Sequence, residues 1–123
     1  MRPARFLPLF GLAVALGASA AAADRFQKLT GAQIRAKFSG MEMSDNVHWR
    51  DFYEPNGTLT SQSMGRQRIG KWRVDKDELC VDRGKDDGGC YQVWVSGKNV
   101  HLKRPTLDFP IMEGVLQTPI RRE

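Results

Sequence analysis

The sequence from Gly70 to Leu102 reads GKWRVDKDELCVDRGKDDGGCYQVWVSGKNVHL, and this stretch decides the fold. It contains both cysteines of the chain, two of the three tryptophans and three turn signals, separated by runs in which apolar and polar residues alternate. Alternation indicates strands with one buried face, because successive side chains of a strand point to opposite sides. The stretch therefore predicts antiparallel strands joined by short turns.

The first turn fixes the pairing of the two strands around it. A two-residue loop at Lys76-Asp77 makes a hairpin. This register places Val74 opposite Leu79 and Trp72 opposite Val81. The apolar residues of both strands then share one face, as a half-buried hairpin requires.

The last turn does the same for a second hairpin. Ser96 to Asn99 has Gly97 at its first central position, where a type II′ turn needs a positive φ. This turn places Val95 opposite Val100, so the flanking apolar residues again fall on one face.

The two hairpins join through the cysteines. Direct pairing of Cys80 with Cys90 places Leu79 opposite Tyr91, again on the apolar face. The three turns thus agree on one set of inward-facing residues. A shift of the pairing register by one residue would expose half of this set to water. The set is Trp72, Val74, Leu79, Val81, Tyr91, Val93, Val95, Val100 and Leu102. This agreement predicts an antiparallel meander.

The first 23 residues predict a signal peptide. Arg2 and Arg5 precede an apolar stretch, Phe6 to Ala18, that is too short to span a bilayer. Ala21 to Ala23 offer the small-x-small pattern of a signal-peptidase site, so we expect cleavage after Ala23 and a periplasmic or secreted protein. The alternative is an uncleaved membrane anchor.

The charges of the remaining chain are nearly balanced. Without the signal peptide, 17 basic residues face 14 acidic ones, and the net charge is +3 instead of +5. The two kinds are interspersed, and no basic run is flanked by aromatic residues. We therefore expect no nucleic-acid partner.

Cys80 and Cys90 are expected to form a disulfide. Directly opposed residues of antiparallel strands have Cα atoms ~4.5–5.5 Å apart, within reach of the bond. An even cysteine count in an exported chain favours a bridge, and the ten-residue spacing matches no zinc or haem signature. We predict a structural role, because nothing marks either cysteine as an activated thiolate.

Two upstream runs alternate in the same way and are joined by the turn signal Pro55-Asn56-Gly57. A three-residue loop there places Tyr53 opposite Leu59. A further turn at Gly65-Arg66 leads into the stretch quoted above and places Leu59 opposite Trp72.

A short helix is expected before the strands. Thr30 can cap its first turn, and Gln33 completes a capping box. The helix carries Ile34 and Phe38 on one face and ends at Ser39-Gly40. At roughly nine residues it is too short to be stable alone. We therefore expect it to dock on the open end of the sheet.

Together these elements predict a mainly β fold. It is an antiparallel meander or a small, partly closed β-barrel of about six to eight strands, with one short N-terminal helix. The single domain spans residues 24–123, with the helix at about 30–39, the strands at about 47–103, and a C-terminal tail at 104–123 laid over the domain. Two short stretches are also expected to be extended: residues 41–45 as an edge segment and residues 114–117 as a further strand.

One candidate site lies inside the sheet. Asp51 points inward opposite Ser61, with Ser63 nearby. Burial among hydroxyls raises the pKa of a carboxylate, and perturbed carboxylates in clefts are functional-site candidates. We take Asp51, Ser61, Ser63 and Tyr53 as candidate ligand-binding residues. The alternative is that Asp51 lies near a mouth, solvated or paired with an arginine.

A second candidate lies on the outer face, where Trp94 falls opposite His101. An exposed tryptophan can anchor a protein partner, so Trp94, His101 and Arg73 are candidate partner-binding residues. The alternative is that the C-terminal tail covers Trp94 with its apolar residues, which are Leu107, Phe109 and Ile111.

No metal or cofactor site is expected. His48 and His101 are the only histidines and fall on different strands. In the acidic turn 82–89, Arg83 and Lys85 interrupt the oxygen ligands, and the bidentate Glu of a calcium loop is absent. Phosphate-loop, dinucleotide and Gly-x-Ser-x-Gly motifs are also absent.

A pattern of Gly-x-Trp-x-Val, then Leu-Cys, then Cys-Tyr spans Gly70 to Tyr91. It resembles small exported proteins of proteobacteria, mostly of uncharacterised function, and Leu29-Thr30-Gly31 and Asn56-Gly57-Thr58 are similar as well. This resemblance covers most of the chain after the signal peptide. It implies an exported β-meander or lipocalin-like fold rather than an activity.

The chain is also similar to periplasmic metalloprotease inhibitors, which are single-disulfide β-barrels with a Gly-x-Trp start. Those proteins inhibit through an N-terminal segment, and Asp24 to Lys28 shows no diagnostic match to it.

We predict non-catalytic binding of a small apolar ligand, an envelope component or a protein partner. The reason is a concave apolar face without a recognisable catalytic set. Inhibition of a periplasmic protease or hydrolase is the alternative, and an enzyme that uses Asp51 is the third possibility. We expect no cofactor and, after signal cleavage, no stable membrane span.

Overall fold

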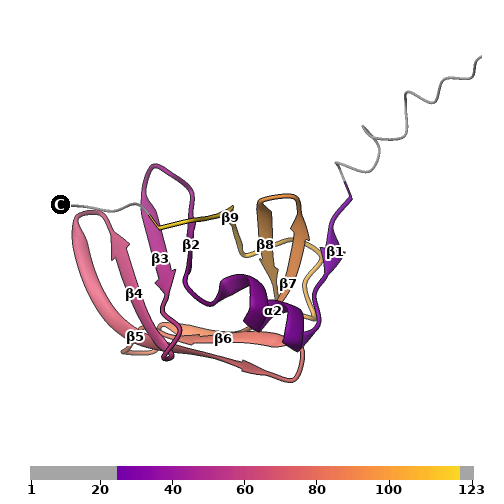
Figure 1. The fold of residues 1–123 in the computed structure, drawn as a ribbon, viewed down its shortest axis with the longest axis horizontal. Coiled ribbons are helices and arrows are strands. Elements are labelled where there is room, and N and C mark those ends of the chain that lie inside the picture. Colours follow the sequence, from indigo (N-terminus) through magenta and orange to yellow (C-terminus); the bar gives the residue numbers. More distant parts are fainter. Residues whose placement is uncertain (1–24, 120–123) are drawn as a thin grey trace, which may run out of the picture.

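The computed structural model describes residues 25–119, so the predicted signal peptide and its cleavage site lie outside the described residues. The described chain forms nine strands and one helix (Figure 1). The strands are β1 (Gln27–Lys28), β2 (Met41–Ser44), β3 (Trp49–Tyr53), β4 (Thr58–Ser63), β5 (Arg66–Asp75), β6 (Glu78–Asp82), β7 (Gly88–Ser96), β8 (Asn99–Lys103) and β9 (Met112–Gln117). The helix is α2 (Gly31–Phe38).

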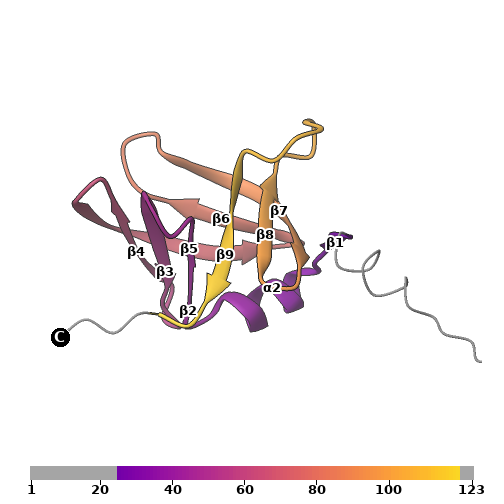
Figure 2. The same ribbon diagram turned by 90° about the horizontal axis from the view of Figure 1, so that it is seen from above.

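Strands β2 to β9 form a closed antiparallel barrel (Figure 2). Each strand from β2 to β8 pairs with the next in sequence, and β9 lies between β8 and β2, which closes the circle. β1 adds to the outer end of β7, where Gln27 pairs with Val95. The predicted β fold with one helix is confirmed, and the barrel is closed rather than partly closed.

Most of the predicted register is confirmed. Trp72 lies opposite Val81, Val95 opposite Val100, and Tyr53 opposite Leu59. Cys80 and Cys90 are paired directly and form the disulfide, with Cα atoms 4.0 Å apart. The apolar residues of the inward set accordingly lie in the core or pack against it.

The predicted turn between β4 and β5 is wrong by one position. The turn residues are Met64 and Gly65, with φ of +54° and +81°, so Gly65 takes the second central position instead of the first. Leu59 therefore pairs with Gly70 and not with Trp72. Because this register shift equals two residues, every side chain keeps its predicted face.

Two segments that were expected as an edge segment and as part of a C-terminal tail are full strands of the barrel. Residues 41–45 were expected as an edge segment, but β2 pairs with strands on both sides, β3 and β9. Residues 112–117 of the expected tail form β9. In the rest of that tail, Phe109 and Ile111 are 60% and 40% exposed and Leu107 is half-buried, and the group that lies over the Trp94 ring is the Lys103 ammonium.

Helix α2 lies across one end of the barrel, as expected (Figure 2). Thr30 and Gln33 form the predicted capping box, and Ile34 and Phe38 are fully buried. The first turn is fixed to the β5–β6 turn, because the Gly31 N–H donates to Asp77 Oδ1 at 2.7 Å. The backbones approach closely here, since a Cβ at Gly31 would lie 2.0 Å from the Lys76 carbonyl oxygen.

The interior of the barrel near α2 is filled by its own side chains. The ring of Tyr53 meets the rings of Phe38 and Trp72 edge to face, with centroids 5.1 and 5.5 Å apart. Leu59, Leu79 and other core residues complete this layer. An eight-stranded barrel is just wide enough for such filling. Open space inside the barrel therefore lies nearer the opposite end.

Candidate functional site

Towards the end opposite α2, polar residues appear on the inward face of three neighbouring strands at one level of the barrel, at Asp51, Ser61 and Arg68. Beyond this level the inward residues of β4 and β5 stay polar, whereas β3 returns to an apolar residue, Trp49. The inward residues are Tyr53, Asp51 and Trp49 on β3; Leu59, Ser61 and Ser63 on β4; and Trp72, Gly70, Arg68 and Arg66 on β5. The barrel thus has an apolar half near α2 and a polar mouth.

A cleft of about 660 Å³ lies at this mouth. We call it the mouth cleft; its lining includes Trp49, Asp51, Ser63, Arg66, Arg68 and Arg83. The predicted ligand-binding residues Asp51, Ser61 and Ser63 all line it. Tyr53 lies one layer deeper, in the core.

Asp51 forms the floor of the cleft and is 3% exposed. Its Oδ1 accepts a hydrogen bond from the Ser61 hydroxyl at 2.6 Å, and its Oδ2 accepts one from Arg83 Nη2 at 2.5 Å. Buried charges are tolerated when they are paired and hydrogen-bonded. The predicted inward position is confirmed, and so is the alternative of an arginine partner at a mouth.

Arg83 reaches this floor from the loop between β6 and β7. Burial by itself lowers the pKa of Arg83, but the charge and hydrogen bond of Asp51 outweigh this effect and raise the pKa above its ordinary value. Asp87 of the same loop lies 3.8 Å from Arg83 and 2.6 Å from Arg68. These contacts fasten the loop to the rim of the barrel.

The Tyr53 hydroxyl is a buried polar group without a hydrogen-bond partner among the described residues. Burial raises the pKa of Tyr53 far above its ordinary value of 10.0, and the charge of Asp51 raises it further. An unsatisfied buried hydroxyl costs free energy and is rare in native proteins. Its presence beneath Asp51 marks this part of the barrel as unusual.

Arg66 differs from the other two arginines of the cleft. It is exposed, and its side chain has no hydrogen-bond or ion-pair partner among residues 25–119. Ser63 lies directly opposite it on β4. The rim therefore offers a guanidinium and a hydroxyl at one level.

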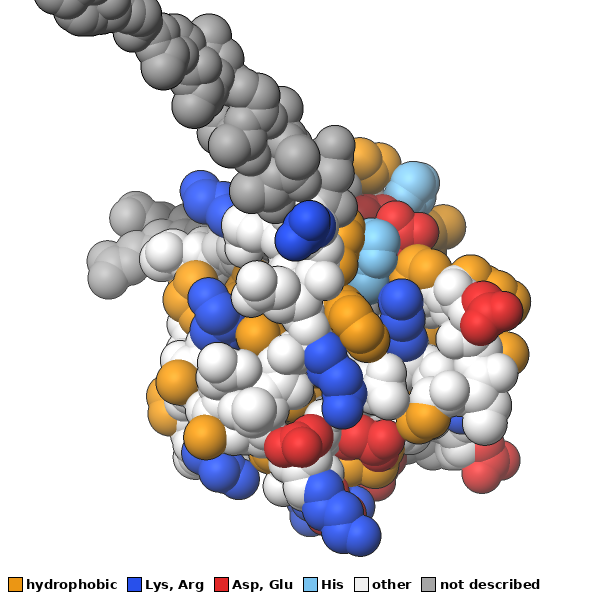
Figure 3. All heavy atoms as spheres, turned by 90° about the vertical axis from the view of Figure 1, so that its right-hand side faces the viewer, with side chains coloured by type: hydrophobic (Ala, Val, Ile, Leu, Met, Phe, Trp, Pro, Cys, Tyr) orange, Lys and Arg blue, Asp and Glu red, His pale blue; other side chains and the backbone are white. Residues whose placement is uncertain are grey.

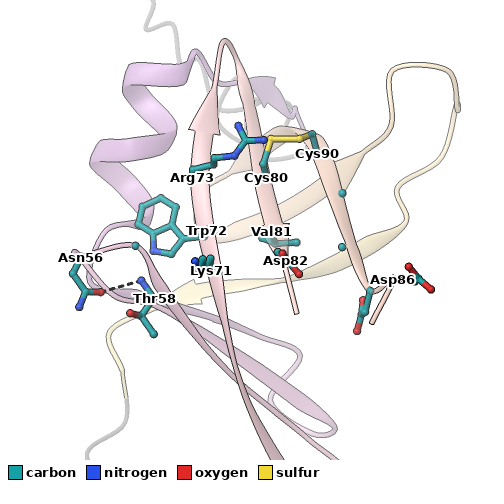
Figure 4. A pocket seen from close by; sticks show the side chains of 14 residues that line it. Asn56, Thr58, Lys71, Trp72, Arg73, Cys80, Val81, Asp82, Asp86 and Cys90 are labelled. Carbon is teal, nitrogen blue, oxygen red and sulfur yellow. Dashed lines mark hydrogen bonds between the residues drawn. A yellow bond between two sulfur atoms is a disulfide. The ribbon is translucent and has the colours of Figure 1, made fainter. Parts of the chain in front are cut away.

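A larger groove, of about 790 Å³, lies on the outer face of β5 to β7 (Figure 4). Lys71, Arg73 and Asp82 line it, and Arg73 points towards the Cys80–Cys90 disulfide. Its charged side chains are solvent-exposed, and no buried polar group of the described chain is unsatisfied there. We favour the smaller mouth cleft, because burial and charge coincide there.

Of the three predicted partner-binding residues, Trp94 and His101 are neighbours on the outer face, and Arg73 lies elsewhere on it. Trp94 is opposite His101 as predicted, and the Lys103 ammonium lies 4.6 Å from the centroid of the Trp94 ring. His101 stacks on Phe26 with centroids 4.0 Å apart. Arg73 pairs with Cys80 on β6 instead. Where this side of the molecule is uncovered in Figure 3, basic, acidic and apolar side chains are mixed.

The two histidines are occupied by different acidic partners. His101 Nε2 lies 3.3 Å from Glu113, and His48 Nδ1 lies 2.9 Å from Asp45. Burial alone raises the pKa of Asp45, but hydrogen bonds from the N–H groups of Val47, Trp49 and His48 outweigh this and hold the pKa well below 3.8. No group of three or more His, Cys, Asp or Glu residues suited to a metal occurs within residues 25–119.

Sequence reasoning did not single out the arginines of the cleft. Arg66 and Arg68 continue the inward alternation of β5, and two inward charges in an otherwise apolar series were a usable signal. Arg83 gave no such signal, because it lies in a loop and meets Asp51 across 32 positions of sequence.

Comparisons of the chain with protein-family models, with curated proteins and with solved structures returned no match. The helix described here, α2, lacks the length and apolar character needed to cross a membrane. The function is therefore inferred from the site itself.

Proposed function

We propose that this protein binds a small ligand in the mouth cleft without transforming it. The observation that carries the proposal is the coincidence of an open cleft with a buried polar floor, the hydrogen-bonded group of Asp51, Ser61 and Arg83. One layer beneath this floor, the Tyr53 hydroxyl has no partner among the described residues. Ligand sites are typically concave and combine apolar walls with a few convergent polar groups. The mouth cleft has this character.

The proposal differs from a purely apolar ligand held inside the barrel. The inward apolar residues pack against one another, so the deep interior of the barrel has no room for the apolar chain of a ligand. The accessible part of the barrel is its polar mouth. A ligand with both polar and apolar groups fits this surface better.

A catalytic role of Asp51 finds little support. Both carboxylate oxygens already accept hydrogen bonds, one from Ser61 and one from Arg83. A general base needs a free oxygen within reach of the proton that it takes. Protease inhibition through the N-terminal segment is not favoured either, because Gln27 and Lys28 pair with β7.

We further propose that residues 1–23 are a signal peptide and that the protein acts in the periplasm. The apolar stretch of the sequence and the Cys80–Cys90 disulfide support this location, since disulfides persist in oxidising compartments. Intact mass and N-terminal sequencing of the expressed protein test it. A chain that begins at Asp24 in the periplasmic fraction supports export, and an uncleaved chain in the cytoplasm contradicts it.

The binding function is tested with a mixed library of neutral, cationic and anionic compounds, followed by saturation-transfer NMR. Ser63→Trp fills the mouth cleft, and Thr58→Trp on the same strand fills the outer groove as a matched control. We expect bound compounds to lose their signals with Ser63→Trp and to keep them with Thr58→Trp. The reverse pattern would move the site to the outer groove, and a library without binders would refute the proposal.

A further inference from the structure

We infer that the ligand of the mouth cleft is a compact organic anion, a carboxylate or a phosphate monoester with a short apolar body. This inference rests on the binding function proposed above and names the class of ligand. Three features carry it: the charge of the lining, the free guanidinium at the rim, and the apolar wall beside it.

The lining of the cleft has more positive than negative charge. Arg66, Arg68 and Arg83 face two carboxylates, Asp51 and Asp87. Asp51 is bound to Arg83, and Asp87 is shared between Arg83 and Arg68. One positive charge therefore remains without a counterpart in the lining, and it lies at the entrance.

Arg66 is positioned to receive an anion. Arg66 and Arg68 alternate on β5, so both point to the inner side at the mouth, and Ser63 pairs with Arg66 across the strands. The Gln67 carboxamide accepts from Gln62 and keeps its own N–H donors. A guanidinium presents its donors in a planar fork that matches a carboxylate or phosphate, and a neighbouring hydroxyl adds a further donor.

The local pairing of β5 gives Arg66 one alternative role. β5 pairs with β6 only from Lys71 to Asp75, so Arg66 lies on a part of β5 that pairs with β4 alone, where a charged residue also protects an open sheet edge. Edge protection does not make an anion bind more tightly than a neutral analogue, so the test below separates the two roles. No ion pair joins Arg66 to another described residue. An exposed arginine without such contacts contributes little to stability.

Part of the lining beside Arg66 is apolar. It consists of Trp49, Met64 and Met112; Trp49 pairs with Ser63, and Met64, in the β4–β5 turn, is 78% exposed. Methionine and tryptophan adapt to flat or short apolar bodies. Because Asp51 and the core beneath it close the barrel, the body has to lie across the mouth. Long chains that need a deep tunnel are therefore excluded.

The test compares two probes of one skeleton, 4-phenylbutyrate and 4-phenylbutanol, by calorimetry on the wild-type protein. We expect the carboxylate to bind ~10-fold or more tightly than the alcohol, because a charge-assisted hydrogen bond is lost with the charge. Arg66→Gln should abolish this preference. Arg73→Gln, on the outward face of the same strand, is the matched control and should retain it. Phenyl phosphate, as a third probe, distinguishes a phosphate from a carboxylate ligand.

Equal affinity for acid and alcohol, or a preference that survives Arg66→Gln, would overturn the inference. No binding of phenylbutyrate and phenyl phosphate at millimolar concentration would overturn it as well. The binding function itself would remain supported if neutral or cationic library compounds still bound in the cleft and were displaced by Ser63→Trp. The two proposals therefore fail on different results.

Discussion

Replacement of Asp51 by alanine tests the floor of the mouth cleft most directly. The side chains of Asp51 and Arg83 are 4% and 10% exposed, so the loss of one leaves the other as a buried charge. Breaking such a pair typically costs ~3–5 kcal/mol. Because Asp87 lies 3.8 Å from Arg83 and retains part of the attraction, we expect the lower end, about 3 kcal/mol.

Urea unfolding at neutral pH, followed by circular dichroism and tryptophan fluorescence, measures this loss. The double variant Asp51→Leu with Arg83→Met removes both charges and should lie within about 2 kcal/mol of the wild type. A loss below about 1 kcal/mol for Asp51→Ala, or single losses that simply add, would refute a buried and coupled pair.

The exposed pair of Arg73 and Asp75 provides the control for this measurement. Its nitrogen and oxygen atoms lie 3.4 Å apart, but the two side chains are 65% and 54% exposed. Ion pairs of this kind contribute ~0–1 kcal/mol, because water screens them and ordering the side chains costs entropy. Arg73→Met should therefore change the free energy of unfolding by less than about 0.5 kcal/mol.

Four further changes test the fold by unfolding in urea, two of them as a function of pH. Gly31→Ala should destabilise the protein although alanine favours helices, because its Cβ would clash with the Lys76 carbonyl oxygen; a gain in stability contradicts this packing. Tyr53→Phe should raise the free energy of unfolding by ~1–3 kcal/mol, because it removes an unsatisfied hydroxyl. It should also reduce the loss of stability above pH ~10, because the unfolded chain releases the Tyr53 phenol proton before the folded protein does. A destabilised variant would show that the hydroxyl is hydrogen-bonded. Reduction of Cys80–Cys90 should cost ~2.7 kcal/mol, and an unchanged urea midpoint would exclude a structural role. The advantage of the wild type over Asp45→Asn should shrink as the pH falls from about 5 to about 2, because the unfolded chain binds the proton first. A constant difference over this range contradicts the lowered pKa.

The register of the central hairpins was predictable because two independent constraints met there. Turn residues fixed the pairing, and alternation fixed the face. Between β4 and β5 only the face was fixed. A register shift of two residues leaves every side chain on its side, so the alternating pattern could not distinguish Gly70 from Trp72 as the partner of Leu59. The position of the turn alone decided the register of β4 and β5, and the sequence did not fix this position, because a glycine fits either central position of such turns.

Closure of the barrel was less accessible from the sequence. β2 has four residues, Met41 to Ser44, and the polar residue Glu42 is buried at 3% exposure. Its carboxylate accepts from Gln117 of β9 at 2.9 Å. A strand this short carries little periodicity, and its partner lies 75 positions away. Both facts follow from tertiary pairing, which no local pattern encodes.

The candidate site shows where the alternating pattern is most informative. Asp51 was placed inward by register alone, and the structure confirms its burial. The same alternation places Arg68 and Arg66 inward, since β5 continues from Trp72 without a bulge. An apolar series that turns cationic on its inward side cannot continue as a core, because unpaired charges are not buried. The residues at which that series changes type therefore mark the opening of the barrel. Arg66, which has no ion-pair partner among residues 25–119, is the residue at which we propose that a ligand contributes the opposite charge.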